Sequence, residues 1–220
     1  MTYIPSIAVK IFAKAPLPGM AKTRLAPALG DVAAAQVAES LLACCVRLSR
    51  QLPAGMDAEF QLSPAPQSAS WQGIEFLAGS RCCDQGEGDL GQRLLRAAER
   101  GLTEADGVVL IGTDCPALTV EHLCWARHCL REVDAALIPA RDGGYVLLAL
   151  RVVNSSLFFD IDWSTARVAE QTRRRLRAAG LSWREQAPLA DLDLPSDIVE
   201  QPQTFIENCA PLARYRGVDG

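Results

Sequence analysis

The amino-acid sequence predicts an α/β fold in which helices cover both faces of a mostly parallel β-sheet. Short apolar runs alternate with helical patterns along the chain, and this alternation is typical of a parallel sheet in a three-layer arrangement. Hydrophobic residues make up 49% of the 220 residues, which is enough to bury a substantial core. We therefore expect one domain over residues 1–220.

In the first half of the chain, strands are predicted at residues 7–12, 58–62, 74–77 and 108–111, the second and third being weaker patterns. Helices are predicted from Asp31, as the N-cap, past Leu48, and over residues 90–101. The first helix is indicated by apolar residues three or four positions apart.

In the second half, strands are predicted at residues 135–138, 145–150 and 182–185. Helices are predicted from Thr119 to Leu130, from Ser164 or Thr165 to Gly180, and from about Pro195. Glycine is a common residue just after a helix end, which supports the boundary at Gly180. Ligands of such sheets bind at the carboxyl ends of the strands, where the polar clusters of interest fall.

Composition excludes several classes of protein. The net charge of −4 and the pI of about 5.3 argue against a general nucleic-acid or membrane-surface binder. No uninterrupted apolar run approaches the roughly 18–20 residues of a membrane span, so we expect a soluble, cytoplasmic protein. The eight cysteines lack C-x2-C spacing, and we expect reduced structural thiols in preference to a metal centre.

The stretch "KAPLPGMAKTRL", residues 14–25, invites a comparison with the P-loop. A P-loop needs two glycines at positions that Pro16 and Ala21 occupy here. What remains is a constrained loop with a glycine, Gly19, and three cations, which are Lys14, Lys22 and Arg24. Such a loop after a strand can bind a di- or triphosphate; the alternative is a solvated basic turn.

Asp114 follows the strand of "VVLIGTDCPAL", residues 108–118. A carboxylate there is well placed to bind Mg²⁺ or Mn²⁺ that bridges phosphate oxygens. The alternative is that Asp114 only caps the following turn.

The segment "PARDGGYVLLAL", residues 139–150, places two glycines before a strand. Gly143 and Gly144 permit close approach of a ligand to the backbone, while Asp142 and Tyr145 add polar groups. Asp-Gly is also a strong hairpin signal, and both interpretations are compatible.

Two further segments are weaker signals. In "DLDLPSDI", residues 191–198, the aspartates Asp191, Asp193 and Asp197 are candidates for a second metal ligand. In "GEGDLGQRL", residues 86–94, glycines and Asp89 precede a helix, which is typical of a loop and cap.

Together, "FAKAPLPGMAKTRL", "GDLGQRL", "GTDCPAL", "PARDGGYVLLAL", "DIDWST" and "DLDLPSDI" resemble an uncharacterised bacterial family usually labelled glycosyltransferase. That family is similar to the nucleotide-diphospho-sugar transferase (GT-A) superfamily, whose members include the molybdenum-cofactor and phospholactate guanylyltransferases. The resemblance covers residues from about 5 to 200 and implies a GT-A α/β/α sandwich. A strict D-x-D is absent, because Gly112-Thr113 precede Asp114.

The resemblance also implies roles for the candidate residues. Lys14, Lys22 and Arg24, with Gly19, would hold nucleotide phosphates; Gly88, Asp89 and Gly91 would lie near the nucleobase; Asp142, Gly143, Gly144 and Tyr145 would face the acceptor or sugar; and Asp114 and Asp193 would bind the metal. We expect Asp114, Lys22 and Asp142 to be the catalytic residues.

The expected function is a transferase that uses a nucleotide-activated donor with Mg²⁺ or Mn²⁺ and an unknown acceptor. Glycosyl transfer from a nucleotide sugar is placed first. The alternatives are guanylyltransferase-like nucleotidyl transfer that releases pyrophosphate, and a nucleotide-binding module without catalysis. Nucleic acid is not an expected partner, and oligomeric state is left open.

Overall fold

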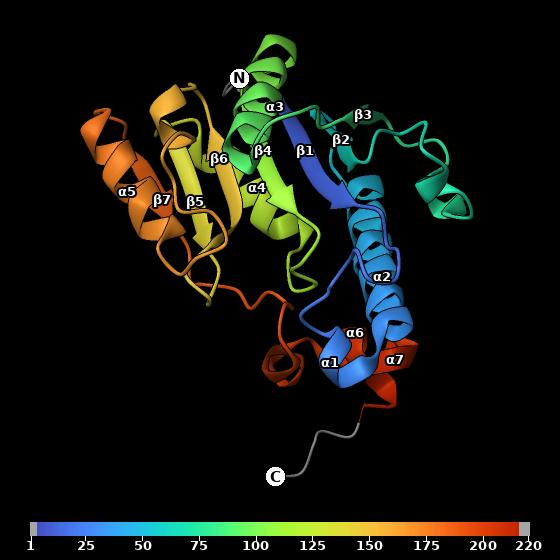
Figure 1. Cartoon of the computed structure of the whole chain (residues 1–220). Coiled ribbons are helices and arrows are strands. Elements are labelled where there is room, and N and C mark those ends of the chain that lie inside the picture. The colour runs from blue at the N-terminus through green and yellow to red at the C-terminus, as the bar shows by residue number, and fades with distance from the viewer. Residues whose placement is uncertain (1–3, 216–220) are drawn as a thin grey trace.

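The computed structural model describes residues 4–215 and is built around a seven-stranded sheet with the order β3-β2-β1-β4-β6-β5-β7 (Figure 1). The strands are β1 (Ile7–Lys14), β2 (Met56–Ser63), β3 (Cys82–Asp84), β4 (Gly107–Gly112), β5 (Ala135–Pro139), β6 (Tyr145–Leu150) and β7 (Trp183–Glu185). Strand β6 runs antiparallel to its neighbours β4 and β5, and the other pairs are parallel. The predicted mostly parallel sheet is confirmed.

The longer helices are α2 (Asp31–Arg50), α3 (Leu90–Glu104), α4 (Val120–Cys129) and α5 (Val168–Ala178). Short helices α1 (Ala26–Leu29), α6 (Gln203–Asn208) and α7 (Ala210–Ala213) lie together near the start of α2 (Figure 1). Single 3₁₀ turns are η1 (Ala69–Trp71), η2 (Glu75–Leu77) and η3 (Ser155–Leu157), and a longer one is η4 (Pro195–Glu200).

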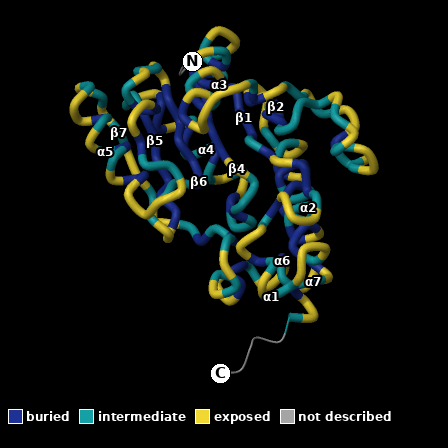
Figure 2. The backbone as a smooth tube through the Cα atoms, viewed as in Figure 1, coloured by how far each residue is buried: buried dark blue, intermediate teal, exposed yellow. Residues whose placement is uncertain are grey.

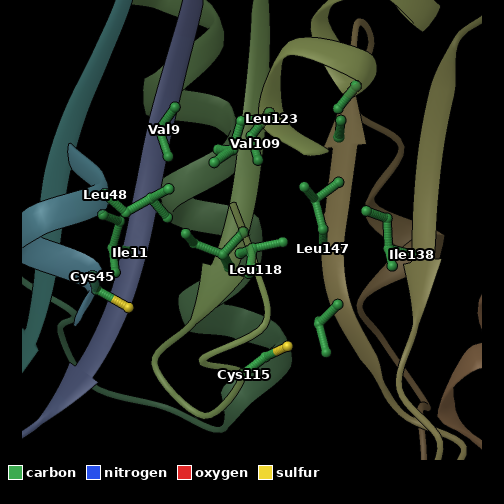
Figure 3. Packing of buried hydrophobic residues seen from close by; sticks show 14 of the residues in the cluster. Val9, Ile11, Cys45, Leu48, Val109, Cys115, Leu118, Leu123, Ile138 and Leu147 are labelled. Carbon is green, nitrogen blue, oxygen red and sulfur yellow. The ribbon is translucent and has the colours of Figure 1, made fainter. Parts of the chain in front are cut away.

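Helices cover both faces of the sheet, as the sequence predicted. On one face, α2 and α4 contribute Cys45, Leu48 and Leu123 to a core with Ile11 and Leu147 (Figure 3). On the other face, α3 and α5 pack on the strand residues that alternate with those of the first face, such as Val108 and Leu110 of β4. The central strands β1, β4, β5 and β6 are accordingly dark along most of their length when the chain is coloured by burial (Figure 2).

A third apolar cluster lies beyond the sheet, where the C-terminal segment meets the first half of α2. Leu25, from the end of the basic loop, is buried there with Leu41 of α2. Leu192 and Phe205 come to the same cluster from the far end of the sequence. This packing brings the basic loop of residues 14–25 beside the aspartate-rich segment of residues 191–198.

One polar network interrupts the apolar strands. Lys10 of β1 is 1% exposed, and its Nζ contacts Glu59 at 3.0 Å and Glu104 at 2.9 Å. Although burial favours the neutral carboxyl, hydrogen bonds from Lys10 and Gln61 and the charges of Lys10 and Arg100 lower the pKa of Glu59 to about 2. This network lies under α3 and ties strands β1 and β2 to that helix.

Some predicted boundaries were wrong. Residues 75–77 form the turn η2, which buries Leu77, and the third strand pairs with β2 at Cys82–Asp84 instead. Gly30, with φ of 84°, is the N-cap of α2, so Asp31 is its first residue. Helix α5 begins at Val168 because Ser164 has a positive φ of 63°, which is incompatible with a helix.

Helix α2 is long and apolar enough to cross a membrane by length and composition. In the structure its apolar residues are divided between two clusters. Leu42 and Val46 pack against the sheet, and Val37 and Leu41 pack against the C-terminal segment. The packing of the helix therefore accounts for its apolar composition.

Candidate functional site

The predicted site residues gather at one edge of the sheet. Strands β1, β4 and β5 end at this edge, and β6 begins there because it runs in the opposite direction. Residues that follow β1 and β4 and the turn between β5 and β6 therefore lie near one another, although the loop after β1 and that turn are more than a hundred residues apart in the sequence.

A cleft of about 620 Å³ opens between the basic loop, the start of α3 and the end of β4. Its charged lining residues are Lys14, Lys22, Arg24, Arg93, Asp89, Asp114, Asp142 and Asp193. Seven of these eight were predicted as site residues from the sequence. Arg93 was not named, although it lies within the quoted segment "GDLGQRL".

Lys22 is at the centre of this cleft. Its Nζ lies 2.5 Å from Asp114 Oδ1 and 3.0 Å from Asp193 Oδ1, and it donates a hydrogen bond of 2.7 Å to the carbonyl of Leu192. Burial disfavours the ammonium, but the two carboxylates outweigh that effect and raise the pKa of Lys22. Lys22 is therefore a fixed positive charge between the two predicted metal ligands.

Two other cations in the cleft are not neutralised by carboxylates. Within residues 4–215, Lys14 makes no ion pair, and Arg93 donates to the carbonyl of Gly88 at 2.8 Å and to Gln85 Oε1 at 3.4 Å. Arg24 lies 3.5 Å from Asp193 but is largely exposed. The cleft thus offers positive charge to an anionic ligand from the end of β1 and from the first turn of α3.

Asp89 caps helix α3. Its Oδ1 accepts a 2.8 Å hydrogen bond from the Gln92 N–H, and Gln92 Oε1 accepts one of 2.9 Å from the Asp89 N–H. This reciprocal capping box satisfies two backbone donors at the helix start. The loop-and-cap interpretation of this segment is confirmed.

The turn between β5 and β6 places Asp142 at the mouth of the cleft. Asp142 Oδ1 accepts a 2.7 Å hydrogen bond from the Gly144 N–H. Gly143 has φ of 93°, and a Cβ there would lie 2.2 Å from the carbonyl oxygen of Ala166. The hairpin interpretation of "DGG" is confirmed, and Gly143 is required by the close contact with the segment before α5.

A second pocket, of about 240 Å³, adjoins the cleft and shares Asp114 and Asp142 with it. Its walls include the rings of Tyr145 and Trp163, which meet edge to face with centroids 6.3 Å apart. Cys115 also lines it, but burial raises the pKa of this thiol to about 12, so it stays protonated.

The three aspartates of residues 191–198 have different environments. Asp193 faces Lys22 and Arg24 in the cleft. Asp197 Oδ2 accepts backbone hydrogen bonds from Asp193 at 2.9 Å and from Leu194 at 2.6 Å, so it caps η4. Asp191 lines the second pocket, where burial and the nearby charge of Asp142 raise its pKa to about 6.

The donor set of the cleft fits a divalent cation held jointly with a substrate. Within residues 4–215, no group of three or more histidine, cysteine, aspartate or glutamate side chains could hold a metal ion by itself. Asp114 and Asp193 are two oxygen donors that already share one cation, Lys22. Magnesium is usually held by one or two carboxylates together with substrate phosphates, which matches this pair.

Three predicted residues do not line either cavity. Gly19 has φ of 72° in the exposed part of the loop. Gly91 is buried, and a Cβ there would lie 2.0 Å from the carbonyl oxygen of Phe158. Gly143 packs as described above. The structure gives Gly91 and Gly143 packing roles.

The chain belongs to a family described as an uncharacterized protein conserved in bacteria (DUF2064), whose model matches residues 48–165, more than half of the chain. No curated protein matches it. The resemblance stated from the sequence motifs is thereby confirmed at the level of the family.

Solved structures place this family within a known fold. A Desulfovibrio desulfuricans protein, provisionally described as a nucleotide-diphospho-sugar transferase, is 26% identical, with a TM-score of 0.84 over 96% of this chain and 98% of that chain. A cytidylyltransferase from Leptospira borgpetersenii is 15% identical, with a TM-score of 0.55 over 89% of this chain and 85% of that chain.

A third structure is glucosyl-3-phosphoglycerate synthase from Mycobacterium tuberculosis, solved with Mn²⁺, UDP and glucosyl-3-phosphoglycerate. It is 13% identical, with a TM-score of 0.54 over 89% of this chain and 75% of that chain. The predicted nucleotide-diphospho-sugar transferase fold is confirmed, and the first two of these proteins are described as transferases.

Proposed function

We propose that this protein is a transferase that binds a nucleotide-activated donor in the 620 Å³ cleft, with glycosyl transfer as its reaction. The observation that carries the proposal is the convergence of Lys14, Lys22, Arg24 and Arg93 with two oxygen donors, Asp114 and Asp193, at the carboxyl edge of the sheet. The description of the Desulfovibrio protein as a nucleotide-diphospho-sugar transferase, and the UDP and Mn²⁺ bound by glucosyl-3-phosphoglycerate synthase, support the same class.

Each side chain has a distinct task in this proposal. Lys14 and Arg93, which no carboxylate neutralises within the described chain, bind the phosphate oxygens of the donor. Asp114 and Asp193 would hold a divalent cation, whose charge would stabilise negative charge on the departing phosphate. Lys22, which contacts both carboxylates, would add a further positive charge beside the phosphates.

In glycosyl transfer, an acceptor hydroxyl attacks the anomeric carbon and loses its proton to a base. The bond from that carbon to the phosphate oxygen breaks, and its electron pair leaves with the nucleoside diphosphate. In the second candidate reaction, nucleotidyl transfer, an acceptor phosphate attacks the α-phosphorus and pyrophosphate leaves. The cytidylyltransferase-like fold favours this second candidate, and both reactions need the same stabilisation of charge.

The test is a binding and product assay on the purified chain. Nucleoside triphosphates and nucleotide sugars are each tested with Mg²⁺, Mn²⁺ or EDTA. The donor that binds should raise the unfolding free energy by about 2.7 kcal/mol at a hundredfold excess over Kd when Mg²⁺ or Mn²⁺ is present, and by less in EDTA. For a chain of this size, that is a shift in Tm of about 5–10 °C. Release of a nucleoside diphosphate identifies glycosyl transfer, and release of pyrophosphate identifies nucleotidyl transfer.

Matched variants localise the activity. Asp114→Asn should lower the rate about 10²–10³-fold if charge stabilisation of the usual size is lost. Asp57→Asn is the control, since Asp57 is exposed near the start of β2, at the opposite edge of the sheet. If no nucleotide shifts the Tm of the wild-type protein, the proposal is wrong.

A further inference from the structure

The second pocket differs from the cleft in its charge. The cleft contains four cations and four carboxylates, whereas the residues that line the pocket include three carboxylates, Asp114, Asp142 and Asp191. Among the lining residues, all of which lie in the described part of the chain, there is no lysine, arginine or histidine. Asp114 is paired with Lys22 of the cleft at 2.5 Å, but Asp142 and Asp191 make no ion pair within residues 4–215. A phosphate or carboxylate group that entered this pocket would therefore meet the like charges of these two side chains.

The remaining lining is apolar, aromatic or hydroxylic. Phe12 of β1, Leu110 of β4 and Leu94 of α3 are apolar lining residues, and the lining rings of Tyr145 and Trp163 meet edge to face. Ser164 and Thr165, which directly follow Trp163, add hydroxyl groups to the lining. Such surfaces pack against carbon–hydrogen faces, while carboxylates accept hydrogen bonds from ligand hydroxyls.

The pocket is also in the right place to hold a reacting group. Asp114 and Asp142 line both cavities. A ligand in the pocket therefore meets a phosphate in the cleft at these two side chains. In Figure 1, β5 and β6 lie on one side of β4, and β1 lies on the other side. The turn between β5 and β6 contributes to the pocket, and the loop after β1 contributes cations to the cleft.

We propose that the 240 Å³ pocket is a subsite for an uncharged, hydroxyl-bearing ring of sugar-like chemistry, and that it discriminates against a phosphorylated group. This inference rests on the proposed function, because it assigns the group that reacts with the donor in the cleft. It selects between the two candidate reactions: an uncharged hydroxyl compound is a partner for glycosyl transfer, and a phosphate is the attacking group in nucleotidyl transfer.

The test uses a matched pair of probes, phenyl β-D-glucopyranoside and its 6-phosphate, with binding measured by ligand-observed NMR. The neutral glucoside should bind at least about tenfold more tightly than the phosphate ester. The single variants Asp142→Asn and Asp191→Asn should each weaken binding of the neutral glucoside about 10-fold, since a hydrogen bond to a charged group is lost. Each should also reduce the ratio of the two affinities, glucoside over phosphate ester. Asp57→Asn should change neither value, and thermal unfolding confirms that each variant is folded.

The uncharged ring could belong to the donor or to the acceptor, and competition distinguishes these sources. If the donor sugar occupies the pocket, UDP-glucose displaces the glucoside and UDP alone does not. If the acceptor occupies it, the glucoside binds in the presence of either nucleotide. Equal or tighter binding of the phosphate ester to the wild-type protein, or no binding of the neutral glucoside, overturns the inference.

The two proposals fail separately in these experiments. A nucleotide-dependent rise in Tm together with a preference for the phosphate ester would reject the sugar subsite and leave the nucleotide cleft in place. Binding of the neutral glucoside, together with no rise in Tm for any nucleotide, would reject the transferase and leave the subsite in place.

Discussion

Replacement of Lys22 by methionine tests the central contact of the candidate site. The substitution keeps an unbranched side chain and removes the ammonium that contacts Asp114 at 2.5 Å, Asp193 at 3.0 Å and the carbonyl of Leu192 at 2.7 Å. The Lys22 side chain is 7% exposed, whereas the two carboxylates are 50% and 38% exposed. Removal of the charge therefore leaves carboxylates that water can reach.

The expected loss of stability follows from these exposures. Two unit charges about 3 Å apart at an effective dielectric constant of about 20 attract by about 5 kcal/mol. The substitution also removes the cost of burying the ammonium, and the freed carboxylates regain solvation. We expect the free energy of unfolding to fall by about 1–2 kcal/mol, which corresponds to a decrease in Tm of about 2–8 °C.

The same change should strengthen metal binding in the absence of nucleotide. The ammonium and a divalent cation compete for the same carboxylate oxygens, so its removal should raise the affinity for Mn²⁺ about 5- to 30-fold if the 1–2 kcal/mol is recovered. Free Mn²⁺ measured by electron paramagnetic resonance gives the affinity directly, and calorimetry or chemical denaturation gives the stability.

The control is Lys14→Met, which removes a cation from the same cleft that makes no ion pair within the described residues. It should leave stability within about 0.5 kcal/mol of the wild type. If Lys22→Met behaves in the same way and its Mn²⁺ affinity is unchanged, Lys22 does not neutralise Asp114 and Asp193 in solution, and this account of the site is refuted.

Three other predictions concern the framework around the site. Asp89→Ala should lower stability by about 1 kcal/mol in urea unfolding, because it removes the cap of α3; an unchanged midpoint would contradict the capping role. Gly143→Ala should lower the free energy of unfolding by more than about 2 kcal/mol in the same assay, because the new Cβ would overlap Ala166. The control is Gly73→Ala, where φ is similar but no atom lies near the new Cβ, and it should lower the free energy of unfolding by only about 1 kcal/mol. The free energy of unfolding should also fall by about 2 kcal/mol between pH 4.5 and pH 2. The pKa of Glu59 is lower in the folded state than in the unfolded state, so the stabilisation that the ionised carboxylate provides is lost as it protonates. Acid unfolding of Glu59→Gln should show a smaller fall over this range.

Local pattern was sufficient for most of the elements. The strand at residues 7–12 and the hairpin at "DGG" were predicted because apolar runs and positive-φ glycines depend on near neighbours in the sequence. The segment at residues 74–77 was assigned wrongly for the same reason. Its apolar residues satisfy a strand pattern, but Leu77 is buried from a 3₁₀ turn, and the partner of β2 is the segment Cys82–Asp84.

The sequence also indicated which residues would belong to the candidate site, but not how they contact one another. The spacing of Asp191, Asp193 and Asp197 did not distinguish them, and only the resemblance favoured Asp193. In the structure Asp191 lines the pocket, Asp193 contacts Lys22 in the cleft and Asp197 caps η4. Arg93 was not named because an arginine in the first turn of a helix has no distinguishing local pattern.

The sequence by itself determined the α/β class, the positions of the loops that follow the strands, and the excess of cations and carboxylates in those loops. Only the tertiary structure decided that Lys22 would meet Asp193, 171 residues away, and that three carboxylates and no cationic residue would line the pocket beside the cleft. The physical reason is that strand and turn formation depend on near neighbours, whereas a site depends on long-range packing. Here that packing is the burial of Leu25 and Leu192 in one apolar cluster, which places the basic loop against the C-terminal segment.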